Sequence, residues 1–372
     1  MIFVIETGSE DFKIFKYSKD ENVYIKEPVR IKSHILRDDE GFINRINSLL
    51  AGSEVLEAVS FRVNFGGDIF REKMLPIDST FKLRMRELIR NSPLGIPPLL
   101  ETVSAFEDNF PELPLYAFFE TSYFNALPDE ERYYAVPMEA PADHDVRRWG
   151  YHGIYHQFNS NVLPGEKKII SVVLDKLVTV CSSVNGKPFS INLGCTPLEG
   201  IMGRTSSGDL DPGIVFYLMR RYNYSIYRID TLLKKESGFL GLTGYDLETD
   251  KLYELAGKDE KTAFAFRVFE NQILKSIGEA LSVIGGIDAI VFCGCYADSL
   301  KPLIFQIIKN LSFLGISIKA LPWPDSPGVR DVSVSGSAVR VIVNSLAWNE
   351  IVYQDTKNIT PKIHPIHPMA RI

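Results

Sequence analysis

The spacing of hydrophobic and polar residues changes several times along this chain. These changes predict strands that alternate with helices. Three short β-rich runs separated by polar turns open each half, which is typical of an antiparallel meander. These runs cover residues 2–7, 12–18, 22–28, 167–175, 176–184 and 187–194. Further strands are expected at the end of 54–63 and at 113–121, 287–295 and 338–345.

Apolar residues spaced three and four apart predict the helices. They cover residues 39–52, 79–91, 99–110, 211–222, 225–237, 261–285 and 299–314, and a last helix starts near 349. Both halves begin with a meander and continue with helices and strands, so we expect an internal duplication of one α/β unit. A chain of 372 residues also favours two domains. Two similar halves would form a central cleft, which suits group transfer from a nucleotide.

Composition and charge exclude several classes of protein. The formal net charge is −6, and no basic block is long enough to follow a nucleic-acid backbone. No uncharged apolar run approaches the roughly 18 residues of a membrane span, and the first residues lack the basic start of a signal peptide. Four cysteines do not make a disulfide framework in a chain of this length. We therefore expect a cytoplasmic protein that binds neither membrane nor nucleic acid.

The most polar loop of the second half is residues 197–212, PLEGIMGRTSSGDLDP. It holds three glycines, one arginine, three acidic residues and three small hydroxyl residues, so it cannot be buried as a core element. Small residues let a phosphate approach backbone N–H groups, which makes a phosphate-handling loop one interpretation. A surface turn is the other.

Two long motifs carry a resemblance to a known family. Residues 147–158 read RRWGYHGIYHQF, and residues 196–216 read TPLEGIMGRTSSGDLDPGIVF. They resemble R-R-Y-G-F-H-G-T-S-H and T-P-L-E-G-hydrophobic-M-G-T-R-S-G-D-I-D-P of the acetokinase family, the acetate, propionate and butyrate kinases. Shorter similar segments lie at residues 4–13, 61–67, 118–128, 237–244 and 287–295.

The resemblance implies a fold, a reaction and partners. The fold is the duplicated two-domain α/β fold of actin, hexokinase and the sugar kinases, which is ribonuclease H-like. The first domain would comprise residues 1–120 and 352–372, and the second residues 121–351. The reaction is in-line phosphoryl transfer, in which ATP and a short-chain carboxylate give ADP and an acyl phosphate, with Mg²⁺. Family members are homodimers, so a homodimer is expected.

The family motifs also assign roles to residues of this chain. His152, Glu120 and Arg204 are the candidate catalytic residues, and Arg62 is the candidate substrate-binding residue. The candidates for binding nucleotide phosphates are Lys13, Gly8, Ser9 and Gly208. Glu6 and Glu350 are the candidates for the metal site. Each role rests on the resemblance, because a histidine such as His152 is more often a structural hydrogen-bonding residue, and a helix start such as that near Glu350 favours an acid in any case.

Departures from the family pattern predict weak nucleotide binding and low or absent turnover. Glu6 replaces an asparagine, Asp11 a hydroxyl residue and Glu120 an aspartate. A second family arginine aligns with Ser206, and Arg204, two residues earlier, is the candidate to replace it. The glycine-containing loop H-L-G-N-G corresponds to residues 173–177, VLDKL, and a loop near G-G-I-G-E-N corresponds to residues 293–299, CGCYADS.

Three functions are consistent with this pattern. The first is a working acyl-phosphate-forming kinase. The second is a catalytically eroded relative that binds a small anion or a partner protein, with Arg62 and His152 as its anion pocket. The third is a dimeric scaffold. Outside these motifs, Cys293 and Cys295 are expected as buried strand residues, and Arg220 and Arg221 as a solvated helix end.

Overall fold

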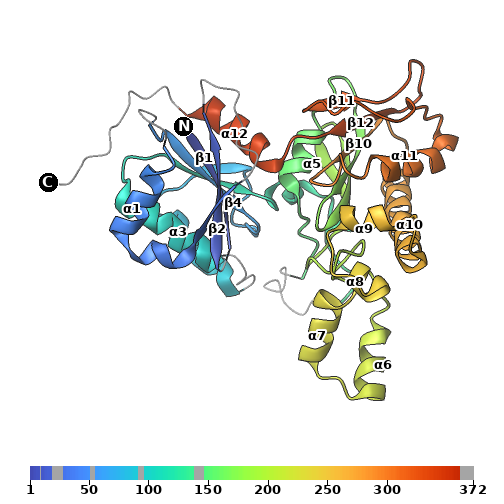
Figure 1. Ribbon diagram of the computed structural model, residues 1–372, viewed down its shortest axis with the longest axis horizontal. Coiled ribbons are helices and arrows are strands. Elements are labelled where there is room, and N and C mark those ends of the chain that lie inside the picture. The colour runs from blue at the N-terminus through green and yellow to red at the C-terminus, as the bar shows by residue number, and fades with distance from the viewer. Residues whose placement is uncertain (9, 19–27, 51–54, 91–95, 138–145, 361–372) are drawn as a thin grey trace. The chain divides into compact units, whose positions relative to one another are not determined.

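We describe the protein from a computed structural model, which describes residues 1–8, 10–18, 28–50, 55–90, 96–137 and 146–360. The chain forms two compact units (Figure 1). Unit 1 comprises Met1–Asn125 and Trp348–Ile372, and unit 2 comprises Ala126–Ala347. The expected domain limits, residues 1–120 with 352–372 and residues 121–351, stay a prediction.

Unit 1 is built on a six-stranded sheet with the order β3-β2-β1-β4-β6-β5. Its strands are β1 (Ile2–Thr7), β2 (Asp11–Tyr17), β3 (Val29–Lys32), β4 (Ala58–Val63), β5 (Met74–Pro76) and β6 (Leu115–Phe119). The first three form the antiparallel meander, and β4 and β6 extend the sheet in parallel to β1. The run at 22–28, expected as the third strand, lies outside the described residues except for Pro28, and β3 follows it.

Helices pack on both faces of this sheet (Figure 1). They are α1 (Asp39–Asn47), α2 (Phe81–Glu87), α3 (Ile96–Asn109) and α12 (Trp348–Ile359), with short 3-10 turns at Ser33–Arg37, Leu88–Arg90 and Ser122–Ala126. On one face, Phe106 of α3 meets Phe61 of β4 edge to face. On the other, Thr356 of α12 hydrogen-bonds Ser60 of β4 at 2.7 Å. Adjacent strand residues point to opposite faces, so α3 and α12 enclose β4 between them.

Unit 2 repeats this sheet topology. Its strands are β7 (Lys168–Leu174), β8 (Val178–Val184), β9 (Lys187–Ile191), β10 (Ala289–Cys293), β11 (Val329–Asp331) and β12 (Arg340–Asn344). The order β9-β8-β7-β10-β12-β11 matches that of unit 1 strand by strand. In both sheets a meander comes first, two parallel strands follow, and a three-residue antiparallel strand closes the edge. The expected duplicated α/β fold is confirmed.

The helices of unit 2 are more numerous than those of unit 1. They are α4 (Asp129–Arg132), α5 (Gly153–Asn159), α6 (Gly213–Tyr222), α7 (Ile226–Lys235), α8 (Gly238–Thr243), α9 (Thr249–Leu255), α10 (Glu260–Ile284) and α11 (Lys301–Asn310), and a 3-10 turn follows at Ser312–Leu314. The long α10 packs on β8 and anchors the main hydrophobic core. No described helix is both long and apolar enough to cross a bilayer.

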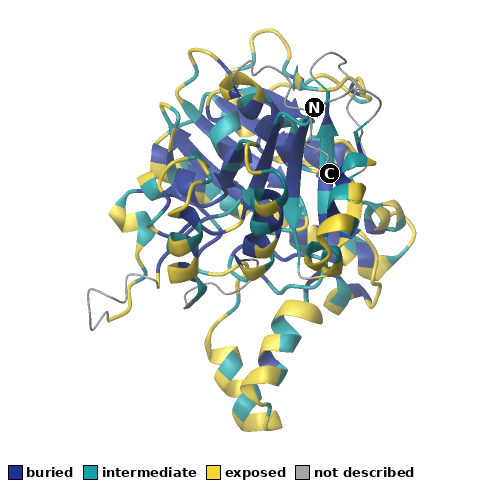
Figure 2. Ribbon diagram, turned by 90° about the vertical axis from the view of Figure 1, so that its left-hand side faces the viewer, coloured by how far each residue is buried: buried dark blue, intermediate teal, exposed yellow. Residues whose placement is uncertain are grey.

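The hairpin formed by α6 and α7 is the most exposed helical region of unit 2. Figure 2 shows it projecting from the unit with mostly exposed residues. Among its described residues, α6 buries none and α7 buries only Ile229. Arg220 and Arg221 end α6 in solvent, as expected.

Candidate functional site

Four charged residues form a continuous row at the carboxyl end of the central strands of unit 1. Glu6 on β1 lies directly opposite Lys13 on β2 and directly opposite Arg62 on β4. Directly opposed residues share a face of the sheet, so the register itself brings these side chains together. Lys13 Nζ lies 2.5 Å from Glu6 Oε2, and Arg62 Nη1 donates to Glu6 Oε1 at 3.0 Å.

Glu120 completes this charged row (Lys13, Glu6, Arg62 and Glu120). It follows β6, where its backbone N–H donates to the carbonyl of Val63 at 2.9 Å. Its Oε1 accepts a hydrogen bond of 2.6 Å from Arg62 Nε, and its side chain is only 2% exposed. The ring of Trp348, the first residue of α12, covers the guanidinium with its centroid at 4.6 Å. Arg62 is therefore held by two carboxylates and an aromatic face.

The other candidates of unit 1 lie at a turn and at a helix start. Gly8 lies in the turn between β1 and β2, where a Cβ atom would come within 2.8 Å of the Asp11 carbonyl oxygen, so the turn requires glycine. Ser9 lies outside the described residues. Glu350 is half-buried in the first turn of α12, as expected for an acidic residue near a helix N-terminus.

In unit 2, His152 belongs to a buried network of polar side chains. It precedes α5 with a left-handed backbone, φ 59°. Its Nδ1 shares a hydrogen bond of 3.0 Å with Thr179 Oγ1, and the same hydroxyl lies 2.8 Å from Nε2 of His156. The other ring nitrogen of His156 lies 2.9 Å from Ser171 Oγ. We call these residues, with Asn159, the His152 network.

Asn159 links this network to the neighbouring strands. Its amide donates to Ser171 Oγ at 2.9 Å and to Cys293 Sγ at 3.0 Å, and it accepts from Asn344 at 3.0 Å. Burial, with a smaller contribution from His152, lowers the pKa of His156 well below its ordinary value. Burial likewise raises the pKa of Cys293 to about 12. The side chains of His156 and Cys293 are therefore uncharged at neutral pH.

The polar loop 197–212 folds back on itself. Gly200 and Asp209 exchange hydrogen bonds of 2.7 and 2.8 Å. Gly208 has φ 68°, and a Cβ atom there would come within 2.6 Å of the Gly200 carbonyl oxygen. Arg204 pairs with the carboxylate of Asp246, which follows α8. The loop is thus a compact substructure whose arginine already has an anionic partner.

The two loops that depart from the family pattern are bonded to each other. Asp175 Oδ1 accepts from the backbone N–H of Lys176 at 2.7 Å and from Cys295 Sγ at 3.2 Å. Tyr296 N–H donates to the carbonyl of Leu174 at 3.0 Å. The expectation that both cysteines are buried strand residues is wrong for Cys295. Strand β10 ends at Cys293, and Cys295 is exposed in the turn that follows.

Of the two metal candidates, Glu6 does not fit Mg²⁺ in this arrangement. Both oxygens of Glu6 contact cationic side chains, Oε2 the ammonium of Lys13 and Oε1 the guanidinium of Arg62. Among the described residues, no group of three or more His, Cys, Asp or Glu side chains is placed to hold a metal ion. Mg²⁺ binds oxygen ligands that are not already neutralised by cations, so the Glu6 carboxylate does not fit this ion while both of its oxygens are paired. The metal-binding roles of Glu6 and Glu350 stay predictions.

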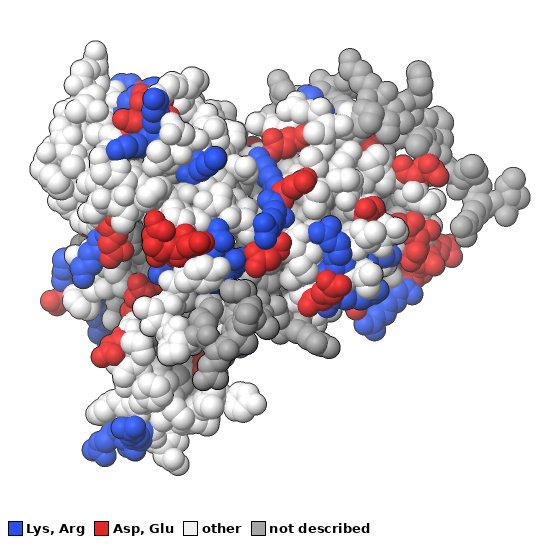
Figure 3. Space-filling view, turned by 180° about the vertical axis from the view of Figure 1, so that it is seen from behind, with Lys and Arg blue, Asp and Glu red and all other residues white. Residues whose placement is uncertain are grey.

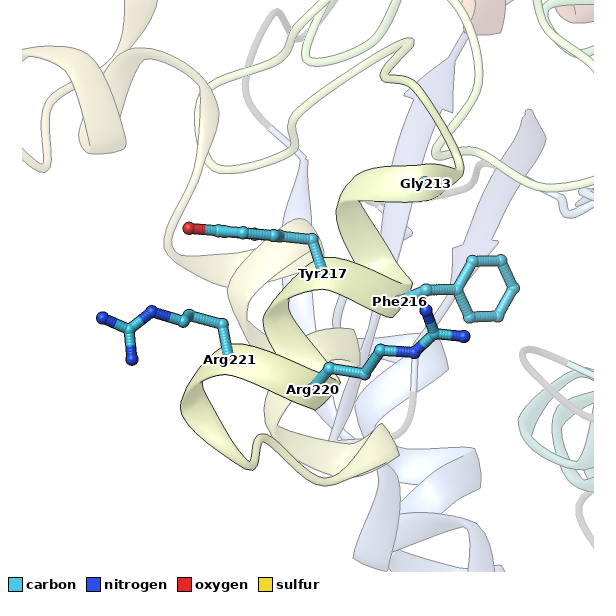
Figure 4. A pocket seen from close by; sticks show the side chains of 5 residues that line it. All are labelled: Gly213, Phe216, Tyr217, Arg220 and Arg221. Atoms are coloured by element: carbon cyan, nitrogen blue, oxygen red, sulfur yellow. The ribbon is translucent and has the colours of Figure 1, made fainter.

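A surface hollow lies on α6 (Figure 4). Gly213, Phe216, Tyr217, Arg220 and Arg221 line it. Phe216 and Arg220 point to one side of the helix, and Tyr217 and Arg221 point to the other. On the face shown in Figure 3, basic and acidic side chains lie near one another rather than forming an extended basic surface.

These features define a class of protein, a duplicated α/β protein with one six-stranded sheet in each of two units. The model of the acetokinase family matches residues 10–352, and the chain belongs to that family. Two similar curated proteins are the acetate kinases of Clostridium novyi (strain NT) and Clostridium acetobutylicum, each 29% identical. The alignments cover 86% and 97% of this chain and 82% and 88% of the relatives.

Solved structures confirm the fold. The acetate kinase of Porphyromonas gingivalis superposes with a TM-score of 0.85 at 23% identity, over 96% of this chain and 99% of that one. A propionate kinase from Francisella tularensis gives a TM-score of 0.82 at 23% identity, with the same coverage. The family and the fold class expected from the sequence are therefore confirmed. The roles of the individual site residues stay predictions.

The structure adds partners that the sequence did not single out. Trp348, Asp246 and Thr179 contact Arg62, Arg204 and His152, respectively. Each of the three is remote in sequence from its partner, so no local motif indicates it. His156 lies four residues after His152, a spacing that brings two side chains together across one helical turn, but the sequence predicted no helix at this place.

Proposed function

We propose that this member of the acetokinase family is catalytically eroded, with phosphoryl transfer from ATP to a short-chain carboxylate that is very slow or absent. The single observation that carries the proposal is the hydrogen bond from the Lys176 N–H to Asp175 Oδ1. This loop resembles the family loop that contacts phosphate. Here its backbone donor is bound to a carboxylate of the protein.

Phosphoryl transfer depends on positioning and on stabilisation of negative charge. Asp175 adds a negative charge where a polyphosphate would lie, and Val173 offers no side-chain donor. The two candidate arginines are also engaged, Arg62 by Glu6 and Glu120 and Arg204 by Asp246. A site with its donors and cations already paired binds ATP weakly and stabilises little developing charge.

A working kinase is the second candidate, and the backbone of His152 favours it. A non-glycine residue with positive φ costs of order 1 kcal/mol, and such strain is concentrated at functional sites. In that case His152 and Glu120 would act on the transferring phosphoryl group, and Arg62 would bind the carboxylate. Gly8, Ser9, Lys13 and Gly208 would then contact the nucleotide phosphates.

Turnover assays distinguish the two candidates. ADP release and hydroxamate formation are measured with Mg²⁺-ATP and acetate, propionate or butyrate, beside the Porphyromonas gingivalis acetate kinase as reference. Loss of two preorganised donors predicts rates lower by about 10⁴–10⁶, because each donor contributes about 10²–10³. Ser206→Arg alone restores only one donor and leaves the rate low. A rate comparable to that of the reference, or full recovery in Ser206→Arg, would contradict the proposal.

A matched pair of variants tests the loop itself. Asp175→Asn removes the charge, whereas Asp250→Asn removes an aspartate that also accepts from the next backbone N–H, at 2.8 Å, but at the start of α9. Melting temperatures are compared with and without millimolar Mg²⁺-ATP. We expect a small shift in the natural sequence and in Asp250→Asn, and a larger one in Asp175→Asn. A large shift at micromolar Mg²⁺-ATP in the natural sequence would show that the phosphates are held after all.

We also propose that the chain is a cytoplasmic homodimer, and that a second copy covers the hairpin of α6 and α7. Large apolar side chains are exposed along this hairpin, including Ile214, Phe216 and Tyr217. Analytical ultracentrifugation of Phe216→Glu tests this, with Phe313→Glu as control, since these side chains are 58% and 76% exposed. A buried charge at the interface should yield monomers only in Phe216→Glu. A natural protein that is monomeric, or a Phe216→Glu variant that stays dimeric, would refute the interface.

A further inference from the structure

The charged row of unit 1 gives Arg62 an anion from within the protein. We propose that Glu6 is a built-in competitor of external anions, whose carboxylate occupies Arg62 Nη1 and thereby keeps free carboxylates and phosphates from binding there. The inference rests on the proposed role of Arg62 in anion binding. It concerns binding alone, so it is tested separately from turnover.

The position of Glu6 is fixed by the backbone of the sheet. Its Cα pairs with Lys13 on one side and with Arg62 on the other, within continuous antiparallel and parallel ladders. A flexible surface side chain would sample many positions, but this carboxylate is delivered between two cations by the register. Its oxygens are divided between them, with Oε2 at 2.5 Å from Lys13 and Oε1 at 3.0 Å from Arg62.

The guanidinium of Arg62 already contacts two anionic groups and an aromatic ring. Two of its nitrogens donate to carboxylates, Nε to Glu120 and Nη1 to Glu6, and Trp348 covers its plane. The two carboxylates differ in exposure. Glu120 is 2% exposed and is the fixed partner, whereas Glu6 is 26% exposed and lies at the accessible end of the row. An external anion would therefore replace Glu6 and not Glu120.

The charge balance of the row supports the same conclusion. Lys13 and Arg62 supply two positive charges, and Glu6 and Glu120 supply two negative charges, so the row is neutral as it stands. A neutral row attracts no further anion. Removal of the Glu6 charge leaves the row at +1, with a guanidinium N–H and an ammonium that are no longer paired with the Glu6 carboxylate, and guanidinium donors bind carboxylate and phosphate oxygens well.

Substitution at Glu6 is also the cleaner experiment. Replacing Arg62 would leave Glu120 charged and buried, so lost binding could not be separated from lost folding. Glu6→Gln keeps the shape and an acceptor for Lys13 while removing the charge. Glu6→Asn introduces the residue of the family pattern and serves as a second variant if the first one folds poorly. Glu57→Gln is the matched control, because Glu57 pairs with the N-terminal amine and is 25% exposed, almost as Glu6 is.

Titration calorimetry with inorganic phosphate and with acetate, on the full chain, is the test, with circular dichroism to verify folding. The expected result is an affinity for phosphate at least about tenfold higher in Glu6→Gln and Glu6→Asn than in the natural sequence, since one charge-assisted hydrogen bond becomes available. Glu57→Gln should bind as the natural sequence does. Equal affinity in the Glu6 variants and the natural sequence overturns the proposal. An equal gain in Glu57→Gln overturns it as well, because the gain would then reflect net charge alone.

Discussion

The two sheets have the same strand order but fill one equivalent row of positions in opposite ways. The row runs across three neighbouring strands, which are β2, β1 and β4 in unit 1 and β8, β7 and β10 in unit 2. On β4 and on β10, it lies four residues after the alanine that begins the strand. In unit 1 the row reads Lys13, Glu6 and Arg62, and in unit 2 it reads Thr179, Val173 and Cys293. In each unit a residue at the start of a helix meets the row, Trp348 over Arg62 and His152 beside Thr179.

The difference shows that the fold specifies where this row of side chains lies but not whether the row carries charge. The charged row of unit 1 ends at partly exposed Lys13 and Glu6, so water screens part of the interaction. The row of unit 2 is buried and holds only uncharged side chains, the hydroxyl of Thr179, the apolar Val173 and the thiol of Cys293, because a charge there would carry a large desolvation cost. Three predictions test this contrast.

The largest difference in stability between the two rows is expected where each row crosses its parallel strand, at Arg62 in unit 1 and at Cys293 in unit 2. Arg62→Ala leaves Glu120 buried without its cation, which should lower the free energy of unfolding by about 3–5 kcal/mol. Cys293→Ala changes the equivalent place in unit 2 but removes only a neutral acceptor of Asn159, so we expect about 0.5–1.5 kcal/mol. Urea denaturation monitored by circular dichroism measures both. Similar losses at the two places would show that charge does not distinguish the rows.

An intermediate effect on stability is expected on the hairpin strands, β2 in unit 1 and β8 in unit 2. Here the larger loss is expected in unit 2. Thr179→Val removes the hydroxyl between His152 and His156, and its cost should be about 1–3 kcal/mol because their buried ring nitrogens lose a partner. Lys13→Met removes a partly exposed ion pair, which should cost less than about 1 kcal/mol. The same denaturation series compares them. A larger loss in Lys13→Met than in Thr179→Val would reverse our interpretation of the exposed end of the charged row.

The smallest effect is the pH dependence contributed by His156. Its pKa in the folded protein lies well below its ordinary value of 6.5, so the unfolded chain takes up this proton first as the pH falls. The stability contributed by the neutral ring is complete above about pH 6.5 and decreases below it, by at most about 1.4 kcal/mol per pH unit. Unfolding free energies at pH 7.5 and 5.5 should differ less in His156→Asn than in the natural sequence. His34→Asn, which removes an exposed histidine of unit 1, is the matched control. An unchanged pH slope in His156→Asn would mean that this ring is not kept neutral.

The sequence predicted the elements whose signals are long and local. The first two strands of unit 1, the meander of unit 2, the helices at α1, α3, α6, α7, α10 and α11, and the strand before Glu120 are where the periodicity places them, whereas β3 begins just after the run expected as the third strand. Strands β5 and β11 were missed because each has only three residues, too few to show an alternating pattern. Helix α5 was missed because seven residues rich in aromatic and polar groups give no clear apolar stripe.

The site could be predicted only in part, because its chemistry depends on long-range register. The family motif makes Glu6 a candidate for the metal site, but pairing across two ladders places it between Lys13 and Arg62. A shift of either ladder by one residue would point Glu6 to the other face of the sheet, and the propensity of a single strand does not encode such pairings. In the same way, the partner of Arg204 lies 42 residues further along the chain, beyond the polar loop itself.

The return of the chain to unit 1 at Trp348 has a consequence for its synthesis. The first segment of unit 1 is translated before unit 2, yet its α12 is made only after the whole of unit 2. Until then, the face of β4 that carries Ser60 lacks Thr356, and Arg62 lacks the ring of Trp348. Nascent unit 2, which is continuous in sequence, can reach its native contacts before unit 1 has all of its own. Unit 1, whose first segment precedes unit 2 in the chain, therefore cannot complete its native contacts until unit 2 has been synthesised.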